Sequence, residues 1–209
     1  GFLEFLREIT ERHKTLLIFD EVITGFRLGL GGAQSFYGVT PDLATYAKAI
    51  GGGLPLSALA GKRDYMGLIA DGTVIHGGTL NGNPIVLAAA KATLEVLERE
   101  NGAVYADLSR RGWRLRSEIE RLLREHGYQV VTAGDGAVFH LSFMGSKPKN
   151  YRELMAADTK TYSDFALALL DEGVLVLPAG RWTCSVAPTD EVVDAQLAAA
   201  VRALPHSNP

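Results

Sequence analysis

The sequence predicts an α/β fold in two parts: a piece of a doubly wound α/β domain, then a smaller α+β domain. A short apolar run, Thr15–Phe19, ends in Asp20 and Glu21, which is typical of a strand buried on both faces of a parallel sheet. The later part of the chain instead alternates helical patterns with short apolar stretches, without any linker. We therefore expect one domain over residues 1–97 and a second over residues 98–209.

The spacing of apolar side chains and glycines defines the remaining elements of the first domain. Residues 2–13 place apolar side chains at helical intervals. The glycine-rich stretch 25–38 is too irregular for a helix or a strand. Residues 43–50 form a short apolar segment that the three glycines 51–53 end, and residues 56–61 predict a further short strand.

The second domain follows a long helical region. Asn83 precedes Pro84, the order expected of a capping residue and the first helical turn. The helical pattern extends to Glu125, with an interruption near Asn101 and Gly102. The later expected elements are strands at residues 129–131, 137–143 and 174–177, and helices at residues 162–172 and 190–204, the last capped by Thr189.

Composition excludes several classes of protein. With 209 residues, 47% of them hydrophobic, and a formal net charge of −3, the chain is a globular protein without the basic stripe of a nucleic-acid binder. No apolar run reaches the roughly 18–20 residues of a membrane span. Cys184 is the single cysteine and the five histidines lack ligand spacing, so we expect no disulfide, no metal site and a cytoplasmic location.

Asp20 is the first candidate for chemistry. Ligands of open α/β sheets bind at the carboxyl ends of the strands, where this residue is predicted to lie. An apolar strand followed by Asp-Glu is also the form of a Walker-B carboxylate, but that interpretation requires a phosphate loop, and Gly61-Lys62 is followed by Arg63. The structural alternative is an aspartate that caps a turn.

Lys48 and Thr79 are the other two candidates. Lys48 interrupts an apolar segment just before the three glycines, so it is either a surface residue or a desolvated amine that attacks aldehydes. Thr79 follows Gly77-Gly78 and precedes a helix. A hydroxyl and free amides near a helix N-terminus favour phosphate binding, whereas a simple glycine turn is the structural alternative.

An acid, an amine and a hydroxyl at ligand-facing positions are the groups that pyridoxal phosphate needs. Together with four motifs in order, they make the chain resemble class III aminotransferases of the fold-type I pyridoxal phosphate family. The resemblance extends over the whole chain and implies the second half of the large domain followed by the small C-terminal domain. The motifs are residues Leu17–Arg27, Gly38–Leu43, Lys48–Pro55 and Gly78–Pro84.

The resemblance implies roles for four residues. Asp20 would pair with the pyridine nitrogen, and Val22 would pack on one face of the ring. Lys48 would hold the cofactor aldehyde as a Schiff base and then move the substrate proton. Thr79 would bind the cofactor phosphate of the neighbouring subunit in a homodimer.

Further motifs narrow the resemblance to one branch. Residues 28–34 and 151–158 are similar to glutamate-1-semialdehyde 2,1-aminomutases and their close transaminase relatives. Aminomutases have a histidine within the segment that reads Ser185–Thr189 here, and this chain lacks it. The proline in this segment, Pro188, is instead similar to the sequence of β-amino-acid transaminases of the same branch. In those relatives an arginine near this strand binds the substrate carboxylate, so Arg181 is a candidate for that role, with a solvated strand-edge charge as the alternative.

The resulting hypothesis is an aminotransferase that moves an amino group between an amino acid or amine and a keto or aldehyde acceptor. One alternative is the aminomutase, which returns the amine to the adjacent carbon of the same molecule. The other is a non-catalytic dimerisation or interaction fragment, because only 19 residues precede Asp20 and the family's phosphate cup and stacking aromatic residue are not among them. We expect an N-terminal part of about 200 residues on a separate or cleaved chain.

Overall fold

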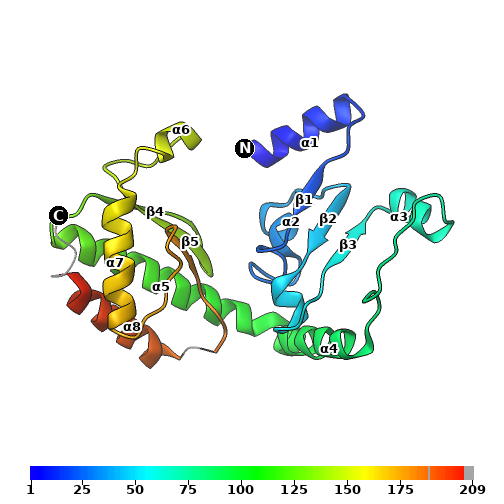
Figure 1. Ribbon diagram of the computed structural model, residues 1–209. Coiled ribbons are helices and arrows are strands. Elements are labelled where there is room, and N and C mark those ends of the chain that lie inside the picture. The colour runs from blue at the N-terminus through cyan, green and yellow to red at the C-terminus, as the bar shows by residue number, and fades with distance from the viewer. Residues whose placement is uncertain (188, 205–209) are drawn as a thin grey trace. The chain divides into compact units, whose positions relative to one another are not determined.

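The computed structural model describes residues 1–187 and 189–204, so Pro188 lies outside the described residues. The chain divides into two compact units, Gly1–Tyr105 and Ala106–Pro209, which are considered separately below (Figure 1). The domain boundary that we expect between residues 97 and 98 stays a prediction. No helix in the described part of the chain is both long enough and apolar enough to cross a membrane.

A three-stranded sheet organises the first unit. Its order is β1-β2-β3, with β1 and β2 parallel and β2 and β3 antiparallel. The elements of the unit are α1 (Phe2–Arg12), β1 (Ile18–Asp20), α2 (Gly32–Tyr37), β2 (Leu43–Tyr46), η1 (Lys48–Gly51), β3 (Ala58–Gly61), α3 (Arg63–Ala70), α4 (Pro84–Glu98) and η2 (Arg99–Gly102). In the parallel pair Asp20 lies beside Thr45, so both strands end at the same edge.

The opposite edge of this sheet is fixed by Asp42, which is 4% exposed. Its carboxylate accepts a hydrogen bond of 2.8 Å from the Leu17 amide and forms ion pairs with Arg7 (3.0 Å) and Lys62 (2.6 Å). Burial alone raises the pKa of Asp42, but the hydrogen bonds from Leu17, Lys62 and Arg7 outweigh it and lower the pKa to about 2. The starts of β1 and β2, the end of β3 and helix α1 therefore meet on one buried charge.

The glycine-rich stretch contains a helix that the sequence does not predict. The irregular composition of residues 25–38 favours a loop, yet Gly32–Tyr37 form α2. Glu21, which is 1% exposed, explains the difference. Its carboxylate accepts hydrogen bonds from the amides of Ala33 (2.7 Å) and Gln34 (3.0 Å) at the start of α2. A carboxylate at a helix N-terminus stabilises the unpaired amides there.

The interruption expected in the long helical region is confirmed. Glu100 and Asn101 have positive φ values of 50° and 57°, which separate α4 from α5 (Ala103–Glu125). The predicted cap of α4 is also present. The Asn83 side chain accepts hydrogen bonds from the amides of Ile85 (3.0 Å) and Val86 (3.3 Å).

The second unit packs helices against an antiparallel sheet. The sheet order is β4-β5-β6, and the buried core is centred on Phe139, Phe165 and Leu169. Besides α5, most of which lies in this unit, the elements are β4 (Val130–Asp135), β5 (Val138–Phe143), α6 (Tyr151–Leu154), α7 (Thr159–Asp171), β6 (Arg181–Thr183) and α8 (Asp190–Ala203).

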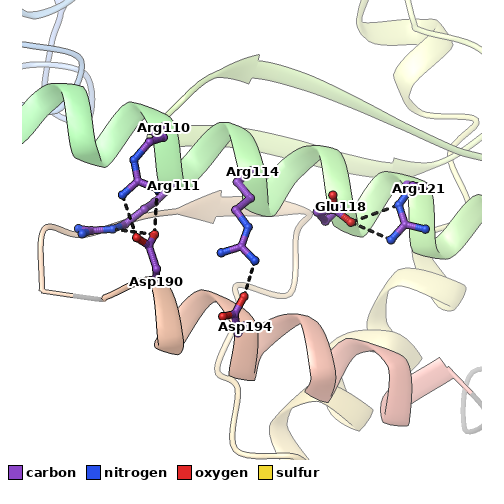
Figure 2. Close-up of polar contacts among 7 residues, drawn as sticks. All are labelled: Arg110, Arg111, Arg114, Glu118, Arg121, Asp190 and Asp194. Carbon is purple, nitrogen blue, oxygen red and sulfur yellow. Dashed lines mark hydrogen bonds and ion pairs between the residues drawn. The ribbon is translucent and has the colours of Figure 1, made fainter.

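Ion pairs join α5 to α8 (Figure 2). Arg110 and Arg111 both contact Asp190 in the first turn of α8, at 3.0 Å and 3.3 Å. One turn later along both helices, Arg114 pairs with Asp194. The carboxylate of Asp190 also lies at a helix N-terminus, where negative charge is favourable.

Two expectations for this unit are wrong. Residues 174–177 do not form a strand, because the sheet position beside β5 is taken by β6. The segment instead closes the end of α7, where the Val174 amide donates to the Leu169 carbonyl oxygen. Thr189 occupies the cap position of α8, but its side chain does not cap the helix with a hydrogen bond.

Candidate functional site

The structure brings Asp20 and Lys48 to the same edge of the parallel pair. Asp20 ends β1, is exposed, and its Oδ1 accepts a hydrogen bond of 3.0 Å from the Val22 amide. Lys48 follows β2 by two residues and is also exposed. Because both strands run in the same direction, their carboxyl ends present an acid and an amine on one side of the sheet. The described residues do not bury the Lys48 amine.

Lys48 has an unusual backbone. Its φ of 53° lies in the left-handed region that side-chain-bearing residues rarely adopt. Ala47 before it is extended, and Gly52, with φ of 57°, ends the short helix η1. A Cβ on Gly52 would overlap the Thr93 hydroxyl of α4, so the glycine allows this turn to rest against α4.

Val22 follows Asp20 by two residues and is half-buried. Three neighbouring residues that sequence analysis did not single out shape this edge: Glu21, Gln34 and Tyr46. Glu21 also accepts a hydrogen bond of 2.7 Å from the Thr24 hydroxyl, and Gln34 donates one of 2.5 Å from Nε2 to the Tyr46 hydroxyl. The only sequence signal for any of them is the place of Glu21 directly after Asp20, at the end of an apolar run.

Thr79 lies in the connection between α3 and α4 and is not part of the strand ends that bear Asp20 and Lys48. It is exposed, in the turn before α4, and neither a hydrogen bond nor an ion pair joins it to either residue in the described structure. The connection between α3 and α4 lies on the side of β3 away from β1 (Figure 1). The Asn83 side chain already accepts hydrogen bonds from two amides at the start of α4. A phosphate at the Thr79 hydroxyl would therefore have to use amides of the turn that contains Thr79.

Arg181 belongs to the second unit. It begins β6 opposite His140 and is exposed at the edge of a cavity of about 390 Å³. The cavity also contains Arg111 and the apolar segment Val174–Leu177. Arg111 is paired with Asp190, so Arg181 is the lining arginine that we consider for a ligand. An arginine at the edge of an apolar cavity suits a carboxylate attached to an apolar group. Among the described residues, no group of three metal-ligating side chains is present in either unit.

Known proteins resemble the chain over nearly all of its length. It is 48% identical over 186 residues to a glutamate-1-semialdehyde 2,1-aminomutase from Methanobrevibacter smithii, covering 88% of this chain and 43% of that protein. An omega-transaminase from Sphaerobacter thermophilus matches with a TM-score of 0.92 and 33% identity, over 99% of this chain and 48% of that one.

A third similar protein is a glutamate-1-semialdehyde aminomutase from Pseudomonas aeruginosa, solved in complex with PMP. The match has a TM-score of 0.86 and 27% identity, and it covers 100% of this chain and 48% of the other. The chain thus spans about half the length of the relatives it matches. These similarities confirm the predicted fold class.

Residues 1–207 match the family described as aminotransferase class-III. That match covers both units and all five predicted site residues. The chain therefore belongs to the class III aminotransferase family.

Proposed function

We propose that the protein containing this chain is a pyridoxal phosphate enzyme that transfers an amino group between an amino acid or amine and a keto or aldehyde acceptor. The observation that carries the proposal is that Asp20 and Lys48 both lie, exposed, at the edge of the sheet where the two parallel strands end. The family match and the PMP complex of the Pseudomonas aeruginosa relative support it.

The donor set at this edge fits the cofactor. Asp20 is exposed, and the Val22 amide holds one of its oxygens, so the carboxylate is oriented and available to a protonated pyridine nitrogen. Lys48 projects from the end of the adjacent strand and is available to an aldehyde. A metal-binding or nucleotide-hydrolysing site would need ligand clusters or a phosphate loop, and neither pattern is present in the sequence.

Each residue contributes one step. Asp20 keeps the ring nitrogen protonated, and Val22 packs against one face of the ring. Lys48 would hold the cofactor through its Nζ, would be released when the substrate amine takes its place, and would then act as general base on the proton of the substrate carbon that bears the amine. Thr79 would hold phosphate, which we assign to the neighbouring subunit of a homodimer from the resemblance to class III aminotransferases. Pyridoxal phosphate itself supplies an aldehyde and a ring that accepts electron density.

The aminomutase is the second candidate, because the Methanobrevibacter smithii relative has that name and 48% identity. The two reactions share every step on Lys48 and differ in whether the product leaves before the amine is returned. The five predicted site residues are compatible with either outcome.

Two assays on the native protein separate these candidates. We expect exchange of an amino group between a β-amino acid and 2-oxoglutarate, lost in Lys48→Ala and kept in the surface variant Lys91→Ala. Lys91 is a matched control because it is an exposed lysine of α4 whose ion pair, with Glu95, lies on the surface of the same helix. Conversion of glutamate-1-semialdehyde without any exchange contradicts the transaminase and supports the aminomutase. A native protein that takes up no cofactor leaves the third candidate, the non-catalytic interaction fragment.

Arg181 is our proposed contact for the substrate carboxylate. If it binds this group, Arg181→Ala raises KM for amino acids at least tenfold and leaves KM for amines without a carboxylate within twofold. Equal effects on both substrate classes would contradict the assignment. Steady-state kinetics with an amino acid and the matching amine measure this difference.

The partners of the chain follow from the same proposal. We propose that further polypeptide, corresponding to the other half of the relatives' length, completes the cofactor pocket, and that the assembly is a homodimer in the cytoplasm. Large apolar side chains exposed around Thr79 support the homodimer, since surfaces of this kind mark protein contacts. They are Val74, Ile75, Leu80 and Ile85, with Ile75 92% exposed.

A further inference from the structure

The left-handed backbone of Lys48 needs a structural cause. A residue with a side chain persists in this region only when the surrounding structure holds it there, and such positions cluster at functional sites. On the far side of the turn, Gly52 rests against Thr93 and Ala89 of α4. On the other side, the turn that contains Lys48 is attached to the end of β2, and Tyr46 is the last residue of that strand.

Tyr46 is connected by hydrogen bonds to the strand that bears Asp20. The Tyr46 hydroxyl accepts a hydrogen bond of 2.5 Å from Gln34 Nε2. The backbone amide of the same Gln34 donates to the buried Glu21 carboxylate at 3.0 Å. Glu21 directly follows Asp20, and its own amide donates to the Thr45 carbonyl oxygen at 2.9 Å. The chain of contacts thus runs from the end of β1, through α2, to the end of β2.

The Tyr46 ring is fixed as well as its hydroxyl. A Cβ on Gly25 would lie 2.5 Å from the ring, so only glycine allows the backbone after β1 to approach this closely. Phe26 contacts the ring from a centroid distance of 5.6 Å. Burial and the Glu21 charge raise the pKa of Tyr46 although the Gln34 hydrogen bond lowers it, so the phenol stays neutral at physiological pH.

We propose that Tyr46 is a positioning residue for Lys48. The hydrogen bond that it accepts from Gln34, which Glu21 holds in place, fixes the end of β2 and thereby the left-handed turn that presents the Lys48 amine. The inference rests on the proposed function, since it assigns Tyr46 a role only through the cofactor bond of Lys48. Displacements of about 1 Å at a reacting group reduce rates as much as a hundredfold, so a modest loosening of this turn is measurable.

Tyr46→Phe in the cofactor-loaded native protein tests the proposal, because it removes the hydroxyl and keeps the ring against Gly25 and Phe26. We expect kcat to fall about tenfold with KM changed less than twofold. We also expect the pH midpoint of the visible absorbance of Lys48-bound cofactor to move by about half a unit or more, a readout that loss of stability alone would not shift.

Two further variants complete the test. Tyr105→Phe is the matched control: it removes a hydroxyl that donates to the Phe26 carbonyl oxygen at 3.2 Å, in the same unit but outside the hydrogen bonds that join Glu21, Gln34 and Tyr46, and should change neither readout. Gln34→Met should reproduce the effect of Tyr46→Phe, and the double variant should add nothing, because both remove the same hydrogen bond.

The outcomes are separable from those for the proposed function. If cofactor bonds to Lys48 but Tyr46→Phe keeps the wild-type kcat and absorbance titration, the positioning role is wrong. Additive effects of Tyr46→Phe and Gln34→Met would overturn it as well. If no cofactor bonds to Lys48 in the wild-type protein, it is the proposed function that fails.

Discussion

At the residue scale, the position of the Glu21 carboxylate depends on Gly32. Gly32 has φ of 61°, and a Cβ there would lie 2.5 Å from Glu21 Oε2. The carboxylate can therefore reach the amides of α2 only because residue 32 has no side chain. Asp20 and Lys48 are candidates from the sequence because each lies at an apolar segment. The role of Glu21 could not be predicted in this way, because its partners include backbone amides 12 and 13 residues away, which no local pattern indicates.

Gly32→Ala tests this dependence. We expect the free energy of unfolding to fall by about 2–3 kcal/mol, from the left-handed backbone plus the displaced carboxylate. The matched control is Gly38→Ala, where φ is 70° but nothing lies within 4 Å, so it should cost only the backbone share of about 1 kcal/mol. Urea unfolding measures both. Equal losses would show that Glu21 does not depend on Gly32.

Asp42 gives a pH-dependent contribution to stability. Its folded pKa of about 2 lies below the ordinary value of 3.8, so its contribution is fully present above about pH 4 and lost as the pH falls towards 2. We expect Asp42→Asn to lower the free energy of unfolding at pH 7 by about 1–2 kcal/mol, since solvent partly screens Lys62.

The pH dependence itself distinguishes this charge effect from a packing effect. The difference between wild type and Asp42→Asn should shrink as urea unfolding is repeated from pH 5 down to pH 3. A difference that stays constant over this range would mean that the carboxylate charge does not contribute.

At the scale of elements, long helices were predictable and short ones were not. Helical periodicity and the Asn83 cap identify α1, α4 and α5, including the interruption between the last two. The helix α2 depends on the distant Glu21, and α3 has only eight residues, too few to establish a period. Residues 174–177 are as apolar as a strand, which is why the sequence predicts one there. A strand also needs a pairing partner, and the position beside β5 is occupied by β6.

Two glycines inside helices should respond to alanine in opposite directions. Alanine favours an open helix position by about 0.5–1 kcal/mol, so Gly67→Ala in α3, with nothing within 4 Å, should stabilise the protein by this amount. In α5, a Cβ on Gly112 would lie 3.1 Å from the Ala137 amide and closer still to the Gly136 carbonyl group. We expect Gly112→Ala to destabilise by about 1–3 kcal/mol, because backbone cannot move aside as a side chain can.

Urea unfolding of both variants checks this pair. A stabilising Gly112→Ala would mean that helix propensity outweighs the contact between α5 and the β4–β5 turn. A destabilising Gly67→Ala would mean instead that α3 is not a regular helix at this position.

At the scale of the whole molecule, the two units differ in how completely they bury their apolar residues. The second unit has an extensive core around Phe139, Phe165 and Leu169. The first buries only Leu17, Phe19, Val39 and Ala44 in its core cluster, and leaves Ile18 of β1 55% exposed. A chain that matches about half of its relatives' length is consistent with a first unit that is completed by further polypeptide.

The fold class was predictable from sequence because motif order and strand position are local and sequential properties. The grouping of site residues was predictable only in part. Asp20 and Lys48 lie at the ends of adjacent parallel strands, a position that the apolar segments before them indicate. Thr79 and Arg181 lie outside these strands, in the connection before α4 and in the second unit, so the roles that we propose for them cannot be read from a local pattern.

The central claim is that Lys48 is the residue that bonds to pyridoxal phosphate, and peptide mapping tests it most directly. The native protein is treated with borohydride, digested and analysed by mass spectrometry, with Lys48→Ala as the control. We predict that the peptide containing Lys48 gains the mass of the reduced cofactor and that the control gains none. Cofactor attached to another lysine, such as Lys62 or Lys91, or found on no peptide of this chain, would contradict the account.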